Sequence, residues 1–482
     1  MLFNSVEFFI FLPIVFILYW FVFKSLRIQN IFIIIVSYIF YGWWDWRFLL
    51  LIALTTACSF ASGILLEKFD NNKTKKKIVC SSNIILNLLI LCYFKYCNFF
   101  GENFAAMFRI FGFEVDWVTL DILLPVGISF YTFQALSYTI DVYNKKMQPS
   151  HDPVAFFAFI SFFPQLVAGP IERATNLLPQ FLKSRTFDSE KATDGMRQIL
   201  WGLFKKVVIA DNCALAANHI FAEYQTLDSF NLFMGAIFFT FQIYGDFSGY
   251  SDIAIGTARL FGINLMQNFN FPYFSKNIPE FWRKWHISLT SWFRDYIYFP
   301  LGGSRCSKQK AIRNTLIIFF VSGIWHGANY TFIIWGLYHA LLFIPWLLID
   351  SKKYKNTVAP NKLLPSLKET AQMAITFILV VIGWIIFRAE NTYQAFDYIY
   401  DMITGFTFSS PEFDPVILVY ILLLLSVEWL QRTKQHGLQL QTCNKSNNIL
   451  KYKSLRWAIY YILLIGTLLL QGVQEDFIYF QF

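Results

Sequence analysis

The residue with the clearest capacity for chemistry is a histidine in an otherwise apolar segment. His326 lies in IIFFVSGIWHGANYTFIIWG, where Gly323 and Gly327 let backbone or ligand approach the ring closely. An ionisable group within a membrane is expensive and is functional by default. Desolvation disfavours a charged imidazolium, and the neutral ring is the form that a general base requires. We therefore predict that His326 is a general base; the alternative is an imidazole that only joins helices.

A second histidine lies in an aromatic, basic segment. His286 belongs to PYFSKNIPEFWRKWHISLTSWFRDYIYFPLGGSR, which prolines and glycines bound on both sides. On a helical wheel of about 100° per residue, the Trp and Tyr side chains share one face and His286 lies at its edge. This pattern predicts one helix in the membrane interface, with its aromatic face inward. The alternative for His286 is a contact with a headgroup or the backbone.

Other polar residues in apolar surroundings are weaker candidates for a site. Asp246 lies in QIYGDFSGYSDIAIG, where we expect acidic side chains to line a cavity or join helices. Asn329 would reach the imidazole of His326 if that helix continued past Gly327. Lys205 and Lys206 interrupt an apolar pattern and must face an interface or a cavity. His339 would face about 140° away from His326 on a continuous helix, which favours a structural role.

The composition requires lipid around these residues. Of 482 residues, 56% are hydrophobic and 15% are charged, whereas a soluble domain carries about 25% charged residues. A soluble multi-domain enzyme, a disordered chain and a fibrous repeat are therefore excluded. Seven cysteines without a CxxC motif predict free thiols and no metal site.

Apolar runs predict an all-α, polytopic transmembrane bundle of about 11 spans, each needing about 20 residues. The short apolar run 153–169, which prolines interrupt, is predicted to be a re-entrant element. No long soluble region remains, so we expect one domain over residues 1–482. The predicted spans are residues 5–23, 30–45, 47–66, 78–100, 120–141, 229–248, 313–327, 331–349, 372–388, 415–430 and 456–472.

The placement of charged residues in the loops predicts the orientation of the chain in the membrane. Lys and Arg in short loops favour the cytoplasmic side. Alternation of basic and acidic loops is self-consistent with both termini outside the cytoplasm, and with cytoplasmic loops at 171–196 and 351–370. The basic loop residues are Lys24, Arg27, Lys73, Lys75, Lys76, Lys77, Lys145, Lys146, Lys308, Lys310, Arg313, Lys352, Lys353, Lys355, Arg432, Lys434, Lys451, Lys453 and Arg456, and the acidic ones are Glu102, Glu114, Asp116, Glu223 and Asp228.

Several motifs follow one another along the chain: YGWWDWRF, LPVGISFYTFQALSYTIDVY, FFPQLVAGPIER, GLFKKVVIAD, QIYGDFSGYSDIAIG, the segment from 268 to 305 with WHISL, SGIWHGANYTFIIWGLYH and the terminal FIYFQF. In this order, these motifs resemble the membrane-bound O-acyltransferase (MBOAT) family, especially the bacterial branch that contains the alginate O-acetyltransferase membrane subunit. The WHISL and WHG elements are specific together. The resemblance implies the MBOAT fold, with His326 as the catalytic histidine and His286 as the second signature histidine.

The resemblance also implies an O-acyltransferase that uses acetyl-CoA as donor substrate, with no bound cofactor or metal. The acetyl group would pass from the cytoplasm to a hydroxyl of an exported polysaccharide, through a periplasmic or anchored hydrolase-like partner in a bacterial inner membrane. Acyl transfer needs a base and stabilisation of an oxyanion. We assign the base to His326 and donor orientation to His286. The expected substrate-binding residues are Trp325, Asn329, Asp246, Arg294, Lys205 and Lys206, the last three by attracting CoA phosphates or, alternatively, anionic lipid.

Three alternatives remain at this point. Related proteins of the family transfer D-alanine or other acyl groups to cell-wall polymers. A transporter or flippase of a polysaccharide precursor would place His326 and Asp246 along a permeation path, although inverted repeats are not evident. A catalytically silent scaffold would recruit an extracellular glycan-modifying partner.

Overall fold

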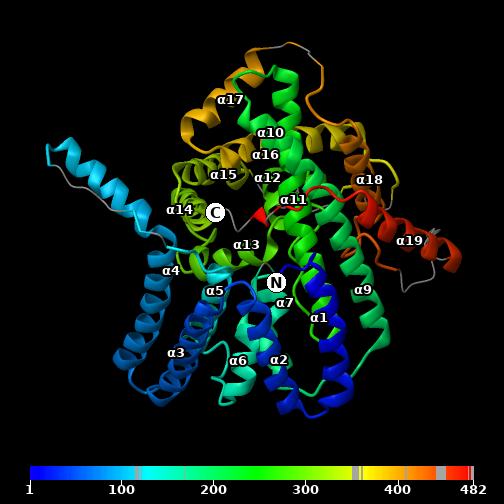
Figure 1. The fold of residues 1–482 in the computed structure, drawn as a ribbon. Helices are drawn as coiled ribbons and strands as arrows, with labels where there is room; N and C mark the ends of the chain where they lie inside the picture. Colours follow the sequence, from blue (N-terminus) through cyan, green and yellow to red (C-terminus); the bar gives the residue numbers. More distant parts are fainter. Residues whose placement is uncertain are drawn as a thin grey trace. The chain divides into compact units, whose positions relative to one another are not determined.

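The computed structural model describes residues 1–113, 119–120, 122–167, 169–349, 358–359, 362–405, 407, 410–440, 452–475 and 477–478. Regular secondary structure within these ranges is helical throughout (Figure 1). The described residues exclude one of the seven cysteines, Cys443, and several residues named above: Glu114, Asp116, Lys352, Lys353, Lys355, Lys451 and residues 479–482 of the terminal motif.

The chain divides into two compact units, whose boundaries fall inside two helices. Unit 1 contains residues 1–195 and 254–266, and unit 2 contains residues 196–253 and 267–482. The two helices that contribute to both units are α9 (Ser189–Phe204) and α11 (Ser229–Leu260). The prediction of one domain over residues 1–482 stays a prediction.

Unit 1 begins with apolar helices whose first turns are capped by polar side chains. Ser5, Ser25 and Asn72 each accept a hydrogen bond from a backbone N–H of the helix that follows, which satisfies a donor that the helix itself leaves unpaired. The helices are α1 (Val6–Ile17) with a π-helical turn (Leu18–Val22), α2 (Leu26–Gly42), α3 (Leu49–Lys68), α4 (Lys73–Ile110), α5 (Ile128–Tyr143), α6 (Pro153–Ser161), α7 (Phe163–Leu166) and α8 (Ala174–Phe181).

Two basic loops of unit 1 meet at one end of α3, α4 and α5, which pack together (Figure 1). Asp70, between α3 and α4, bonds Lys76 Nζ at 2.7 Å and Lys145 Nζ at 2.8 Å. The hydrogen bonds from Lys145 and Lys76 lower the pKa of Asp70 to about 2. The loops after the third and fifth predicted spans therefore lie on the same side of unit 1, as the charge pattern predicted.

The apolar run at 153–169 is broken, because α6 ends at Ser161 and α7 follows after Phe162. Its re-entrance into the membrane stays a prediction. The stretch 171–196, expected to be a loop, instead contains α8 and the start of α9. Buried Glu172 organises this region by accepting hydrogen bonds from Asn176 Nδ2 and Met266 N, while burial raises its pKa to about 7.

Unit 2 contains the second half of α9, most of α11 and the later helices. Gly202 and Gly249 let α9 and α11 approach closely: a Cβ on Gly202 would lie 2.6 Å from the carbonyl oxygen of Gly249. The remaining elements are a π-helical segment (Lys205–Ala210), α10 (Asp211–Ala222), a 3₁₀ turn (Pro272–Phe274), α12 (Ile278–Lys284), α13 (Ile287–Phe293), a π-helical turn (Arg294–Tyr298), α14 (Lys308–His326), α15 (Tyr330–Leu348), α16 (Leu367–Arg388), α17 (Thr392–Thr404), α18 (Val416–Leu430) and α19 (Lys453–Leu469).

The all-α prediction is confirmed, and each predicted span coincides with at least part of a helix. Within the described residues, four helices are long and apolar enough to cross a membrane, at Trp46–Lys68, Lys73–Ile110, Tyr330–Leu348 and Leu367–Arg388. Val6–Val22, Leu26–Gly42 and Val416–Leu430 are shorter apolar helices. The predicted span 120–141 begins later, at Ile128, after a left-handed Gly127. The total of about 11 spans stays a prediction.

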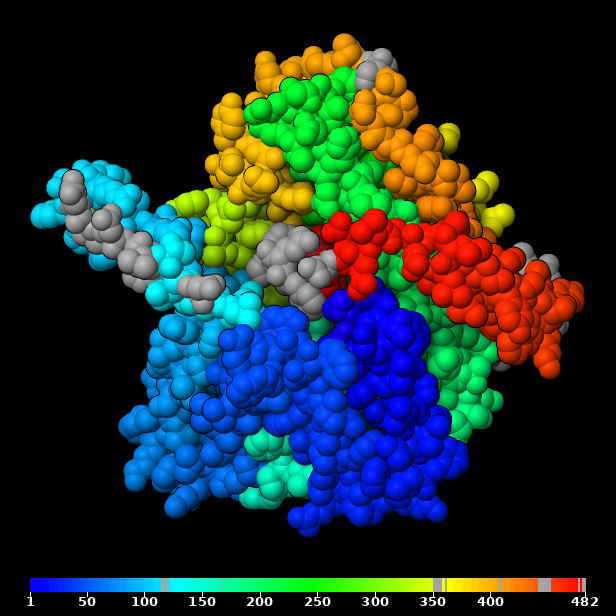
Figure 2. All heavy atoms as spheres, viewed as in Figure 1, coloured from blue at the N-terminus to red at the C-terminus, as the bar shows by residue number. Residues whose placement is uncertain are grey.

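Large apolar side chains cover the surface of several helices, as lipid contact requires. On α19, which lies on the face seen in Figure 2, the exposed apolar residues include Trp457, Tyr461, Ile462, Leu468 and Leu469. Water would penalise such a continuous apolar face, whereas hydrocarbon does not. The protein is therefore a multi-pass membrane protein.

The close approach of α9 and α11 predicts how unit 2 responds to one added methyl group. Gly202→Ala should destabilise the protein by about 1–3 kcal/mol, because neighbouring backbone must shift. Gly466→Ala in α19 is the matched control, since a Cβ there meets only Leu470 Cδ1 at 4.0 Å. Thermal unfolding in detergent measures both variants, and equal melting temperatures would contradict the close packing.

Candidate active site

His326 is the last residue of α14, and a sharp chain reversal places it there. Gly327 is extended, with φ −174°, and α15 starts at Tyr330. The two helices pack side by side (Figure 1). Gly323 and Gly336 are needed at their contact, because a Cβ at either position would overlap a carbonyl oxygen of the other helix. The glycines that the sequence places around His326 thus form a tight helical hairpin.

The imidazole of His326 lies among aromatic rings and is 5% exposed. Its ring centroid is 5.0 Å from that of Trp335 on α15 and 5.2 Å from that of Phe387 on α16. Both contacts are edge-on, an arrangement that aromatic pairs favour. Two helices other than α14 therefore fix the orientation of this histidine.

His286 lies between two short helices, so the prediction of one continuous interfacial helix is wrong. The helix α12 ends at Lys284, Trp285 is extended, and His286 takes the left-handed conformation with φ +41° before α13 begins. Left-handed backbone is costly for a residue with a side chain and needs support from its surroundings. The aromatic face was nevertheless predicted correctly, because Trp282, Trp285 and Trp292 are buried.

Asn268 supplies the support for the turn at His286. Its carbonyl oxygen accepts from Ile287 N at 2.8 Å, and its side-chain oxygen accepts from Ser288 Oγ at 2.9 Å. The amide of Asn268 in turn donates to Ser251 Oγ on α11 at 3.0 Å. The bonds made by the buried Asn268 outweigh the local helical preference of the segment.

One tryptophan links the two histidines that were predicted to be catalytic. The Trp325 ring centroid lies 6.0 Å from that of His286 and 4.9 Å from that of His326. On its other side, His286 meets the Phe247 ring edge-on at 4.6 Å. Burial lowers the pKa of His286 to about 3, so this ring is neutral near pH 7. The structure thus brings His286, Trp325 and His326 into one aromatic site.

A third histidine, His339, belongs to the same cluster and was missed as a site residue. It is fully buried on α15, with its ring centroid 5.2 Å from that of Trp335 and 5.0 Å from that of Trp282. Trp335 therefore separates His326 from His339. The wheel that placed the two apart assumed one continuous helix, whereas the reversal at Gly327 brings α15 back along α14. The WHG motif followed by a polar ANY turn is the signal that could have found it.

The helix of His326 ends before Asn329, so the continuous helix on which Asn329 would reach that imidazole is not formed. Asn329 is the N-cap of α15, where its side-chain oxygen accepts from Thr331 N at 3.1 Å. Its amide donates to the carbonyl oxygen of Glu390 at 2.7 Å. The side chain thus stabilises the chain reversal that positions His326.

Lys205 and Lys206 are buried in unit 2 and form ion pairs. Lys205 Nζ lies 2.7 Å from Asp252 and 2.8 Å from Ser248 Oγ. Lys206 Nζ lies 2.8 Å from both Asp211 and Asp246. The lysine side chains are at most 4% exposed and are enclosed by these carboxylates.

Arg294 is the one residue of the expected phosphate-attracting set with an exposed side chain. Its Nε donates to Asp295 at 2.8 Å, and its guanidinium lies 5.8 Å from the Phe299 ring centroid. The π-helical turn that begins at Arg294 follows α13 directly. This cation is therefore accessible close in sequence to His286.

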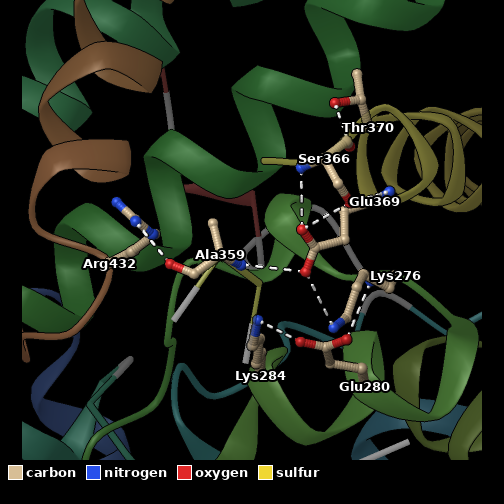
Figure 3. A network of polar contacts seen from close by, with 8 residues as sticks. All are labelled: Lys276, Glu280, Lys284, Ala359, Ser366, Glu369, Thr370 and Arg432. Atoms are coloured by element: carbon tan, nitrogen blue, oxygen red, sulfur yellow. Dashed lines mark hydrogen bonds and ion pairs between the residues drawn. The ribbon is translucent and has the colours of Figure 1, made fainter. Parts of the chain in front are cut away.

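A polar network supports the helices that carry the aromatic site (Figure 3). Glu280 on α12 accepts from Lys284 Nζ at 2.8 Å and from Lys276 N at 3.0 Å. Glu369 on α16 accepts from Ser366 N at 3.0 Å and from Ala359 N at 3.2 Å, and pairs with Lys276 Nζ at 3.6 Å. The network fixes the start of α12, which leads to His286, and of α16, which carries Phe387.

Metal-binding residue types do not gather at this site within the described ranges, where no group of three or more His, Cys, Asp or Glu side chains is suited to a metal ion. The six cysteines that the structure describes are free thiols.

Helices, apolar surface and buried histidines define a polytopic membrane protein with an internal site. The sequence model of MBOAT, the membrane-bound O-acyltransferase family, matches residues 39–351, which include both His286 and His326. The chain belongs to this family and is an O-acyltransferase.

Curated relatives agree with this assignment. The chain is 42% identical to "Probable alginate O-acetylase AlgI" of Pseudomonas aeruginosa, over 80% of this chain and 72% of the relative. It is 34% identical to the peptidoglycan O-acetyltransferase of Helicobacter pylori, over 84% of this chain and 80% of the relative. It is also 31% identical to the teichoic acid D-alanyltransferase of Bacillus subtilis, over 55% of this chain and 69% of the relative.

The support of the turn at His286 predicts the effect of removing Asn268. Asn268→Ala should destabilise the protein by about 1–3 kcal/mol, because the amide and hydroxyl groups that it bonds are left buried without it. Asn270→Ala is the control, since the hydrogen bond described for Asn270 comes from its backbone. Chemical or thermal unfolding in detergent measures the difference, and a loss no larger than that of the control would contradict this role.

Proposed function

We propose that the protein transfers an acetyl group from cytoplasmic acetyl-CoA to a hydroxyl of an exported polysaccharide. The names of two relatives support acetyl transfer to a polymer, alginate in one and peptidoglycan in the other. D-alanyl transfer is the alternative that the third relative favours. Acetyl transfer is preferred because the two O-acetylating relatives match a larger share of this chain.

The observation that carries the proposal is the aromatic site with His326 and His286. Both rings are buried, and Trp325 contacts both of them. Exclusion of water suits thioester chemistry, because it limits hydrolysis of the donor and strengthens electrostatic interactions.

In the proposed reaction His326 acts as general base. Its imidazole takes the proton of the acceptor hydroxyl, and the oxygen attacks the thioester carbonyl. The new C–O bond forms, the C–S bond breaks, and the imidazolium returns its proton to the departing CoA thiolate. Trp335 and Phe387 orient the ring, so that little reorganisation is needed during the reaction.

His286 acts as the group that orients or polarises the donor. Its low pKa keeps it neutral, so it contributes as a dipole and not as a cation. Trp325 lies between the two histidines and would contact substrate beside both.

Electrostatic attraction of the CoA phosphates is assigned to Arg294. Its side chain is exposed, whereas Lys205 and Lys206 are enclosed with carboxylates. Their positions therefore support structural roles for the two lysines. Asp246 likewise binds Lys206 and a backbone N–H, so its two oxygens have partners from the chain itself.

The proposed location is a bacterial inner membrane, with both termini outside the cytoplasm. A periplasmic or anchored hydrolase-like partner would receive the acetyl group and complete its transfer to the polysaccharide. The alternation of loop charge supports this orientation.

Replacing the proposed base tests the function. His326→Ala should reduce acetyl transfer by at least about 100-fold, the usual contribution of general acid–base catalysis. Transfer of radiolabelled acetyl from acetyl-CoA to polymer is measured in membranes that contain the acceptor and partner.

His219→Ala is the matched control, because His219 lies on α10 and the bond described for it is made by its backbone. It should retain normal transfer. Membrane insertion and protein level should match the parent in both variants. Normal product acetylation by the His326→Ala variant would refute the assignment of the base.

The pH dependence separates the roles of the two histidines. With a pKa of about 3, His286 is neutral throughout the range from about pH 5 to pH 9, where an ordinary histidine, with a pKa of about 6.5, titrates. His286→Gln should therefore lower the rate without changing the shape of the pH–rate profile in that range. Loss of an inflection near neutral pH in this variant would show that His286 itself titrates during turnover.

A further inference from the structure

The chain turns back into unit 2 after α19. Helix α19 ends at Leu469, and its exposed apolar residues precede a segment without regular structure. In Figure 1 this red segment runs from α19 back toward α11. Phe477 and Ile478 are each only 1% exposed. The end of this segment, at Phe477 and Ile478, is therefore buried within unit 2, whereas Leu470 and Val473 are exposed.

Contacts to its backbone fasten this segment to α10 and to the π-helical segment Lys205–Ala210. Asn212 Nδ2 donates to the carbonyl oxygen of Leu470 at 3.0 Å. Gly472 lies so close to Asp211 and Asn212 that an added Cβ would be 2.9 Å from Asn212 N. Lys206 Nζ donates to the carbonyl oxygen of Glu475 at 3.0 Å.

A buried charge cluster binds the end of the segment. Lys206 lies 2.8 Å from both Asp211 Oδ1 and Asp246 Oδ1, and all three side chains are at most 3% exposed. The single ammonium of Lys206 balances the charge of only one of the two carboxylates. Further hydrogen-bond donors are therefore required to offset the free-energy cost of burying the second carboxylate. Ile478 N supplies such a donor to Asp246 Oδ2 at 2.7 Å. The charge balance thus creates a binding position for the backbone of the segment.

The segment connects this cluster to His286. The Phe477 ring lies 4.3 Å from the Tyr250 ring and 6.0 Å from the Phe247 ring, measured between centroids. Phe247 in turn meets the ring of His286 at 4.6 Å. Phe477 therefore packs behind the aromatic wall that contacts His286.

We propose that Asp246 is a positioning residue: together with Lys206 it fixes the C-terminal segment, so that Phe477 completes the aromatic wall behind His286. The effect on transfer rests on the proposed function, because it acts through His286. The contacts distinguish Asp246 from Asp211. Both pair with Lys206, but the bond to Ile478 is made by Asp246. A cluster that served folding alone would need the two carboxylates about equally.

The test measures the position of the segment and the rate of transfer separately. In full-length protein in detergent, Ile478→Cys is introduced together with Cys92→Ser, because Cys92 is exposed. Maleimide labelling of the introduced thiol is compared in this parent, with Asp246→Asn added, and with Asp211→Asn added as the matched control. Acetyl transfer is measured for the same two Asp variants in the unmodified chain, with kcat and KM for acetyl-CoA determined separately.

Asp246→Asn should make the introduced thiol react at least about 10-fold faster, because release of the segment is a local opening. It should also reduce kcat by about 10-fold with little change in KM, the effect of misplacing a group that does not bind the donor. Asp211→Asn should change neither quantity by more than about 3-fold. The proposal would be overturned if the introduced thiol were labelled at the same rate in the parent and in the Asp246→Asn variant. It would also be overturned if Asp246→Asn and Asp211→Asn increased the labelling rate equally.

A second pair of variants leaves the buried charges intact. Phe477→Ala should lower kcat, and Phe477→Leu should restore part of it, because Leu refills much of the space behind Phe247 and Tyr250. If Asp246→Asn also exposes the buried Cys213 to maleimide, the variant is unfolded, and the Phe477 pair then decides. Full activity in Phe477→Ala would overturn the proposal.

His326→Ala separates a failure of this inference from a failure of the proposed function. It should abolish transfer while leaving the introduced thiol protected from maleimide. Transfer that persists in His326→Ala would refute the function, whereas loss of transfer there, combined with unchanged labelling in Asp246→Asn, would refute the positioning role alone.

Discussion

Two buried lysines and the carboxylates that neutralise them organise unit 2. Asp246 and Asp252 lie on α11 and pair with Lys206 and Lys205, which a π-helical segment presents toward them. Burying an ammonium is tolerable only when carboxylates and further donors surround it. The close contact of Gly202 with Gly249 lets α9 and α11 approach far enough for these bonds to form.

From α11 the polar contacts extend to the turn at His286 and to the C-terminal segment. Ser251 bonds Asn268, which holds the left-handed turn at His286, and Asp246 binds the backbone of the C-terminal segment. The rings of Phe247, Trp325 and Trp335 then fill the space around the histidines. Directional hydrogen bonds thus determine the conformation and position of the backbone, and aromatic packing determines how the imidazoles are oriented. The combination of a hydrogen-bonded backbone and an aromatic surrounding suits an acyltransferase, because a general base in such an enzyme must be shielded from water and held in one orientation.

Several features of the protein were predictable because they depend on local pattern. Long apolar runs specify helices for a membrane, and glycines beside His326 specify close packing. The buried aromatic residues of the 280–296 region were predicted from their spacing, as was the family from the WHISL and WHG motifs. The position of each charged residue was not predictable to the same degree. Lys205 and Lys206 look available in a linear sequence, although their partners Asp211, Asp246 and Asp252 enclose them.

The sequence by itself therefore determined the membrane environment, the helical class and the two histidines that we propose act in acyl transfer, since hydropathy and short motifs are properties of neighbouring residues. The tertiary structure alone decided that α12 and α13 are separate, that α15 packs back along α14 and that His339 returns to the same cluster. A helical wheel cannot anticipate these outcomes, because the bonds of Asn268 and the capping by Asn329 override the preference for a continuous helix. Those bonds join residues that the chain brings together only after it has folded.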